Sequence, residues 1–240
     1  MMISPETYYE KNLKGKTAEQ ILVAIRGLKK EISRLKNNIE NPSDLHRMDP
    51  SDLCMTDPSE DVRLSCTRMY LERAKQALVE AGGTYVPSKA ELEAEEFNAN
   101  IPFISKVEFC IGGFSGGFET RTYTIEGDNI HIDVEHSLIS KHSDLGDVEI
   151  EEMDKDSFLK GLADLHIGEW CRNYDSSRWG DTVLDGTQWH LYIYYSNGRR
   201  PVKIEGSNDY PYNFDELKRL LGIDDRYDFN ELKRLLGIDL

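Results

Sequence analysis

The sequence has no long hydrophobic run. Its longest purely apolar stretch is Ile21–Ile25, far short of the ~20 residues that span a bilayer. No basic, apolar and small-residue signal pattern opens it. We therefore expect a cytoplasmic protein that does not associate with membranes.

Cysteine is also sparse. The four cysteines, Cys54, Cys66, Cys110 and Cys171, include no C-x-x-C pair. Their spacing predicts neither a zinc site nor a redox motif, and we expect reduced, packed thiols. No other motif predicts a bound metal or cofactor, so none is expected.

Positive charge is in the minority. The chain has 29 Lys plus Arg against 44 Asp plus Glu, and residues 101–240 hold 15 of the former and 27 of the latter. An acidic surface repels nucleic acid, which binds through Lys and Arg. Direct nucleic-acid binding is not expected. One hypothesis is that the protein is an acidic decoy or inhibitor of a basic, nucleic-acid-handling protein.

The first 100 residues carry helical periodicity. Thr17 and Gln20 have the spacing of a capping box, which predicts the start of a long helix that ends before Pro42. A second helix is expected from Pro58 to Ala81, with Asp57 as its cap. Its expected buried residues are Val62, Cys66, Met69, Tyr70, Ala74, Ala77 and Leu78. We predict an antiparallel helical hairpin domain over residues 1–100.

After Pro102 the hydrophobic period changes to two. Three strands are expected between residues 106 and 134, then a helix from Asp156, a hairpin turning at Asn197-Gly198, and a helix from Asn213. The Pro201 ring predicts that the second hairpin strand, Val202–Gly206, is an edge. The fold class is therefore α+β: the helical hairpin, then a five-stranded antiparallel sheet with packed helices in the order β-β-β-α-β-β-α over residues 101–226.

Aromatic residues concentrate between Trp170 and Phe214. Trp170 and Tyr174 match W-x-x-x-Y, and Asp185–Phe214 contains D-G-x-x-W-x-L-x-I-x-Y and G-S-N-x-Y-P. This pattern resembles a domain found in many uncharacterised bacterial proteins, and the resemblance implies no activity. We interpret Trp170, Trp189, Tyr195 and Tyr210 as core packing between helix and sheet, with an aromatic ligand pocket as the alternative.

Two polar clusters are weak site candidates. His131, Asp133 and Glu135 alternate on one expected strand face, where the outer two are too far apart to share a metal ion. Asp185, His190, Glu169 and Asp175, with Asp181, form a carboxylate and histidine group that could perform acid and base chemistry. A hydrolase that uses these carboxylates with His190 is the enzymatic alternative.

The C-terminus repeats itself. Residues 212–224 read YNFDELKRLLGID and residues 227–239 read YDFNELKRLLGID, an offset of 15. We expect one copy to pack on the sheet through Phe214, Leu217, Leu220, Leu221 and Ile223. The other copy, a separate segment over residues 227–240, repeats this face as Phe229, Leu232, Leu235, Leu236 and Ile238. It could pack beside the first copy, compete with it, or exchange into a second subunit.

The leading hypothesis is a non-enzymatic protein-interaction or regulatory protein of bacterial or mobile-element origin. Its partner would be another protein, or a second copy of the chain, bound through the helical faces. Two apolar helical faces and the lack of a complete catalytic constellation favour it.

Overall fold

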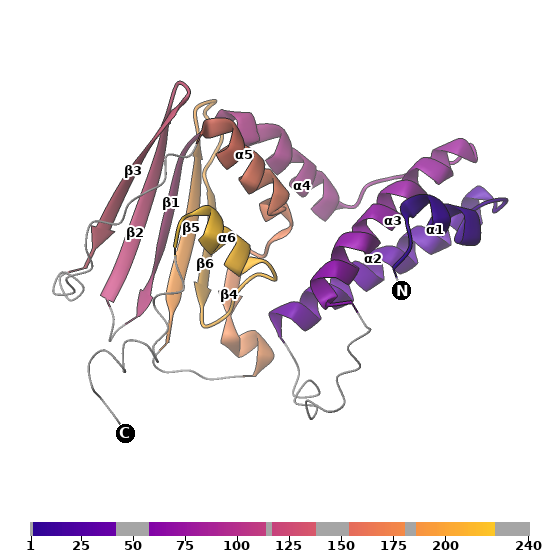
Figure 1. Cartoon of the computed structure of the whole chain (residues 1–240), viewed down its shortest axis with the longest axis horizontal. Helices are drawn as coiled ribbons and strands as arrows, with labels where there is room; N and C mark the ends of the chain where they lie inside the picture. The colour runs from indigo at the N-terminus through magenta and orange to yellow at the C-terminus, as the bar shows by residue number, and fades with distance from the viewer. Residues whose placement is uncertain (1, 42–57, 114–116, 138–153, 181–185, 224–240) are drawn as a thin grey trace. The chain divides into compact units, whose positions relative to one another are not determined.

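The computed structural model describes residues 2–41, 58–113, 117–137, 154–180 and 186–223 (Figure 1). The chain divides into two compact units, Met1–Ser88 and Lys89–Leu240. The helix α4 (Lys89–Asn100), which the sequence analysis placed in the first domain, belongs to the second unit.

The first unit contains α1 (Pro5–Asn12), α2 (Ala18–Glu40) and α3 (Glu60–Glu80). The predicted capping box is confirmed, since Gln20 N–H donates to the Thr17 hydroxyl and Thr17 N–H donates to Gln20 Oε1. Asn38, near the end of α2, donates to Glu60 at the start of α3. The two helices therefore run antiparallel. No helix among the described residues is long and apolar enough to cross a membrane.

The buried face of α3 differs in part from the predicted one. Val62 and Met69 are 48% and 45% exposed, whereas Leu64 and Leu71 are buried. Two apolar stripes run along this helix at the same spacing, and the larger leucines take the interface. The helix also begins later than predicted, because Ser59 accepts a hydrogen bond from Val62 N–H as the cap. Asp57 lies outside the described residues.

The second unit is built on a sheet of six described strands, one more than predicted. They are β1 (Ile104–Gly113), β2 (Gly117–Glu126), β3 (Asn129–His136), β4 (Asn173–Asp175), β5 (Gln188–Tyr195) and β6 (Val202–Ser207), in the order β3-β2-β1-β5-β6-β4. Every pairing is antiparallel except that of β4 with β6. The three residues of β4 are too few to show a period of two, so no local pattern predicts this strand.

The parallel β4 overturns the prediction that β6 is an edge. β6 pairs with β5 on one side and with β4 on the other. Pro201 lies just before the strand, where its missing N–H removes no ladder hydrogen bond. The hairpin between β5 and β6 forms as predicted, but its last pair is Ile193 with Val202, so the connection is longer than a two-residue turn.

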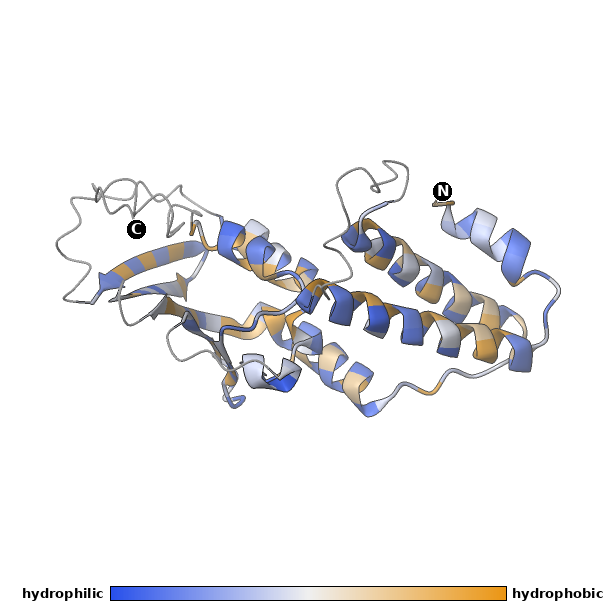
Figure 2. Ribbon diagram, turned by 90° about the horizontal axis from the view of Figure 1, so that it is seen from below, coloured by the Kyte–Doolittle hydropathy of each residue, from blue (hydrophilic) through white to orange (hydrophobic). Residues whose placement is uncertain are grey.

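Helices cover one face of this sheet. α4, α5 (Lys155–Asp164), α6 (Phe214–Leu220) and the short 3-10 helices η3 (Ile101–Phe103) and η5 (Ile167–Glu169) contribute to one hydrophobic core, and Figure 1 shows α5 and α6 over the strands. Alternate strand residues such as Phe109, Leu191 and Ile204 are fully buried beneath them. Figure 2 shows this alternation as orange and blue bands along the strands. The remaining strand residues form the opposite face, which we call the open face because no helix among the described residues of this unit packs on it.

Gly206 lies where the core is so tightly packed that there is no room for a side chain. Its Cβ, if one were present, would lie 2.1 Å from Trp189 Nε1, and the indole is fixed because Nε1 donates to the Asp209 carbonyl at 2.9 Å. We expect Gly206→Ala to lower the free energy of unfolding by about 1–3 kcal/mol. Denaturant titration followed by tryptophan fluorescence reports on this unit, which holds all three tryptophans.

Gly27 is the control for that substitution. It lies in α2, and a Cβ there would meet nothing within 4 Å. Gly27→Ala should leave the fluorescence transition unchanged and stabilise the first unit by roughly 0.5–1 kcal/mol, followed by circular dichroism. An unchanged transition in Gly206→Ala would contradict the packing described.

Candidate functional site

The site with the most complete set of contacts is the groove that holds residues 212–223. We call it the docking groove, and its main contributors are Phe109, Arg121, Tyr123, Gly161, Leu165 and Trp189. Seven residues form α6, too few for a helix to be stable alone. The helix therefore depends on the groove, and the predicted docking of this copy on the sheet is confirmed.

The apolar part of the groove receives four side chains that are almost completely buried. Phe214, Leu217, Leu221 and Ile223 are 7%, 0%, 1% and 5% exposed. The Phe214 ring centroid lies 4.8 Å from that of Trp189. The interpretation of this tryptophan as core packing is confirmed, since it forms the wall against which α6 lies.

A polar clamp holds the C-terminal end of α6. Arg121 Nη1 donates to the carbonyl oxygens of Leu221 at 2.8 Å and Gly222 at 2.7 Å, and Tyr123 Oη donates to the Leu221 carbonyl at 2.5 Å. Glu119 pairs with Arg121 Nε at 2.5 Å, and both charged side chains are 6% exposed. The clamp satisfies carbonyls that a helix end leaves without partners.

Gly222 lets the chain turn into this clamp. Its φ is +61°, in the left-handed region that favours glycine. A Cβ here would also lie 3.2 Å from Arg121 Nη1. At the other side of the helix, Leu220 packs against Gly161 of α5, where a Cβ would be 2.5 Å from the leucine Cδ1. Glycines on both sides thus allow the close approach of α6.

The apolar residues through which the first copy packs in the groove recur in the second copy. Phe229, Leu232, Leu235, Leu236, Gly237 and Ile238 stand 15 residues after Phe214, Leu217, Leu220, Leu221, Gly222 and Ile223. The later set lies outside the described residues. The set of residues that packs in the groove therefore occurs twice in the sequence.

His190 lies on the open face of the sheet. Its Nε2 is 3.6 Å from Glu108 Oε1, and its ring stacks on Tyr192 at 4.4 Å between centroids. Tyr192 Oη donates to Glu205 Oε1 at 2.5 Å, and this hydrogen bond raises the pKa of the phenol to about 12. Lys203 Nζ lies 4.8 Å from the Tyr192 ring centroid. These groups form one polar cluster across three strands, in which His190 Nε2 is buried and has no hydrogen-bond partner among the described residues.

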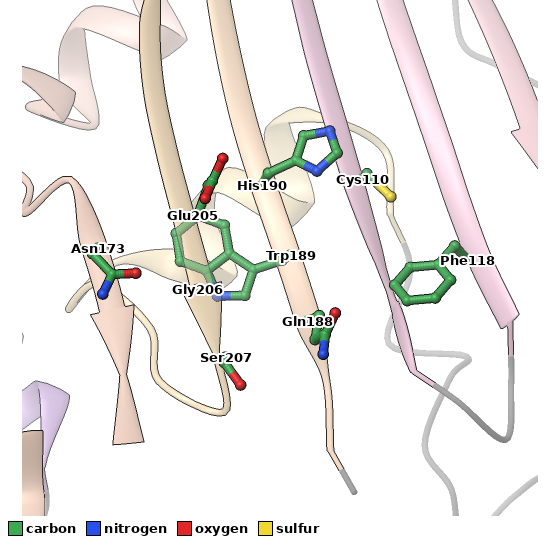
Figure 3. A pocket seen from close by; sticks show the side chains of 9 residues that line it. All are labelled: Cys110, Phe118, Asn173, Gln188, Trp189, His190, Glu205, Gly206 and Ser207. Carbon is green, nitrogen blue, oxygen red and sulfur yellow. The ribbon is translucent and has the colours of Figure 1, made fainter. Parts of the chain in front are cut away.

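A shallow hollow of about 270 Å³ adjoins this cluster (Figure 3). Its lining residues are Cys110, Phe118, Asn173, Gln188, Trp189, His190, Glu205, Gly206 and Ser207. Burial raises the pKa of the Cys110 thiol, which disfavours the thiolate that a nucleophile needs. The hollow therefore lacks an activated nucleophile among its lining residues.

The structure does not gather the predicted carboxylates around His190. Asp175 lies on β4, and β6 separates this strand from β5, which places the two strands about 10 Å apart. Its carboxylate accepts a hydrogen bond from Ser177 N–H and caps the 3-10 helix η6 (Ser176–Trp179). Glu169 belongs to η5, on the helix-covered side of the sheet. Asp181 and Asp185 lie outside the described residues.

The predicted row on β3 is also separate. His131, Asp133 and Glu135 are exposed, and His131 Nε2 lies 3.6 Å from Glu126 Oε2. In the described part of the chain, no three His, Cys, Asp or Glu side chains are grouped so that they could hold a metal ion.

Sequence reasoning missed the two buried charged pairs of this unit. Besides Arg121 with Glu119, Arg178 pairs with Asp209, which is 3% exposed and also accepts from Trp179 Nε1 at 3.2 Å. A signal for the first pair was present in the sequence. Glu119 and Arg121 alternate with Tyr123 at a spacing of two, which places all three side chains on the same face of β2. Asp209 comes from the loop after β6 and Arg178 from the four-residue 3-10 helix η6, and neither segment is long enough for a periodicity to mark burial.

Comparisons with protein-family models, curated proteins and solved structures find no match to this chain.

The clamp should dominate the stability of the second unit. Arg121→Met leaves Glu119 buried without its guanidinium and removes the donor of two helix-end hydrogen bonds. We expect the free energy of unfolding, measured by tryptophan fluorescence, to fall by about 3–5 kcal/mol. Adding Glu119→Gln should recover part of the loss. As a control, Arg219→Met breaks the exposed pair with Glu216 and should cost less than about 1 kcal/mol.

Tyr123 should give stability a specific dependence on alkaline pH. Burial is the main cause that raises its pKa from 10.0 to about 12. Because the folded pKa is above the unfolded one, the contribution of the neutral phenol is complete below pH 10 and is lost as the pH rises towards 12. The difference in unfolding free energy between the native chain and Tyr123→Phe should therefore narrow over that range. A constant difference across a pH series of denaturant titrations would contradict this.

Proposed function

We propose that this chain is a non-enzymatic, cytoplasmic protein-interaction or regulatory protein, and that the surplus copy of the repeated segment is its contact element. The observation that carries the proposal is that the docking groove is filled by residues 212–223, while the same apolar residues recur in residues 227–238. An apolar helical face of this size finds a protein surface to cover it.

The mode of recognition follows from the docked copy. Its Phe214 and Leu217 enter an apolar groove, and its last carbonyls meet cationic and hydroxyl donors. Because the second copy has the same residue types at the same spacing, we propose a partner with an apolar groove that ends in hydrogen-bond donors. A helix bound in a groove is a recurrent form of peptide recognition. The partner is a different protein or another copy of this chain.

The size of the apolar face supports a measurable affinity. Each large aliphatic or aromatic side chain that becomes fully buried contributes about 1.5–3 kcal/mol. Five such residues repeat in the second copy, so their burial would contribute about 8–15 kcal/mol towards the entropy cost of ordering the segment. The cluster around His190 offers less apolar surface, because it consists of polar side chains that contact one another.

Removal of the second copy tests the proposal. A chain that ends at Asp225 keeps the docked copy intact and should lose about a hundredfold or more in affinity, either for itself or for its partner. Light scattering over a concentration series measures the self-association of the chain. Titration with the isolated partner measures the affinity for that partner.

The matched control is a full-length chain with Leu232→Asp and Leu236→Asp. It keeps the tail but places charges on its apolar face, so it should behave as the shortened chain does. If neither variant changes the oligomeric state or the affinity for any partner, the second copy is not a contact element.

A further inference from the structure

The two copies of the repeated segment differ at only two positions. The first copy has Asn213 and Asp215, where the second has Asp228 and Asn230. Both residues of the first copy make polar contacts in the docking groove or along α6. The groove can therefore distinguish two segments whose apolar faces are identical.

Asn213 makes the contact that discriminates most. Its Nδ2 donates to the Leu165 carbonyl at 2.8 Å, at the point where the groove meets the end of α5. An aspartate in this place has no donor when ionised, and it would set a negative oxygen against the carbonyl oxygen. We expect this exchange to disfavour docking of the second copy about tenfold.

Asp215 adds a smaller preference. Its Oδ1 lies 2.9 Å from Lys218 Nζ, and its carboxylate is in the first turn of α6, where negative charge is favourable. The side chain is 74% exposed, so replacement by asparagine changes occupancy only about twofold.

The connection to the sheet favours the first copy as well. Six residues separate Ser207, the last residue of β6, from Phe214, and fifteen more separate it from Phe229. The longer loop lowers the probability of docking about sevenfold. Together the three effects favour the first copy about a hundredfold, which leaves the alternative as a minor population of a size that proteins commonly hold.

We infer that the docking groove can hold either of two segments of the same chain. Residues 212–223 occupy it in the major state, and residues 227–238 replace them in a minor state. The replacement frees the first copy. This inference rests on the proposed function in one respect: the copy that is not docked is the one presented to a partner. The groove then decides which of the two segments a partner meets.

Hydrogen exchange measured by mass spectrometry tests this on the full chain without any partner. The decisive variant exchanges the two sets of residues, Asn213→Asp, Asp215→Asn, Asp228→Asn and Asn230→Asp, and keeps composition and charge. Protection should be strong over residues 214–223 in the native chain. In the variant, docking of residues 229–238 should be favoured over docking of residues 214–223 about threefold. The preference that comes from the two polar residues is reversed, whereas the entropy cost of the longer loop still favours the first copy. Peptides that include Tyr210 or Leu240 distinguish the two copies.

Two further variants cover the remaining outcomes. Leu232→Asp in the exchanged chain should return protection to residues 214–223. Leu217→Asp in the native chain disables the first copy, so residues 229–238 should gain protection while β1 and β5 keep theirs. Loss of protection in β1 and β5 of that variant would overturn the inference, because the second copy would have failed to replace the first.

Three other results would also overturn it. Protection that stays on residues 214–223 in the exchanged chain would show that the two residues do not select the copy. Simultaneous strong protection of both copies would place them in separate sites. A concentration-dependent dimer would place the second copy in the groove of a neighbouring chain. The first two results do not depend on whether a partner exists. A dimer would overturn the replacement within one chain while supporting the proposed function with a second copy as the partner, so the two failures are distinguishable.

Discussion

The second unit depends on one buried guanidinium. Arg121 joins β2 to the last carbonyls of α6, which follow it by 100 and 101 residues in the chain. Its charge is balanced by Glu119 on the same strand, and Tyr123 adds a third donor to the same helix end. A buried charge without such partners would be strongly unfavourable. The helix that closes the core is therefore held in one register by a polar contact, while its apolar side chains provide most of the burial.

The polar clamp and the apolar groove act on different properties of the bound segment. Phe214 and Leu217 fit a surface formed by Trp189 and its neighbours, and any segment with the same spacing would bury the same area. The hydrogen bonds from Arg121 to backbone carbonyls require that the helix of the bound segment end at the position of Gly222. Neither contact distinguishes the two copies, so in the mechanism inferred above the selection rests on Asn213, Asp215 and the length of the connection from β6. Specificity between near-identical ligands then comes from a few polar groups.

Much of this fold was accessible from the sequence, and the failures have physical causes. The capping box at Thr17, the period-two strands and the docking of Phe214 and Leu217 all follow from local patterns that the structure confirms. β4 was missed because three residues show no period. The assignment of β6 as an edge was wrong because it rested on Pro201, which lies just before the strand and removes no ladder hydrogen bond. In the site, the apolar face was predicted, whereas Arg121 and Asp209 were not. Burial of charge is decided by partners distant in the chain, and no local pattern records them.

The left-handed glycine at the end of α6 is part of the repeat. With φ at +61°, Gly222 ends the helix inside the repeated segment itself, and Gly237 occupies the same place in the second copy. Each repeat thus carries a glycine at the place where the first copy ends its helix. The repeated unit of 15 residues therefore includes the helix-ending residue as well as the apolar ones. Every contact of α6 with the described core comes from the first copy, and the second copy differs from it at only two positions.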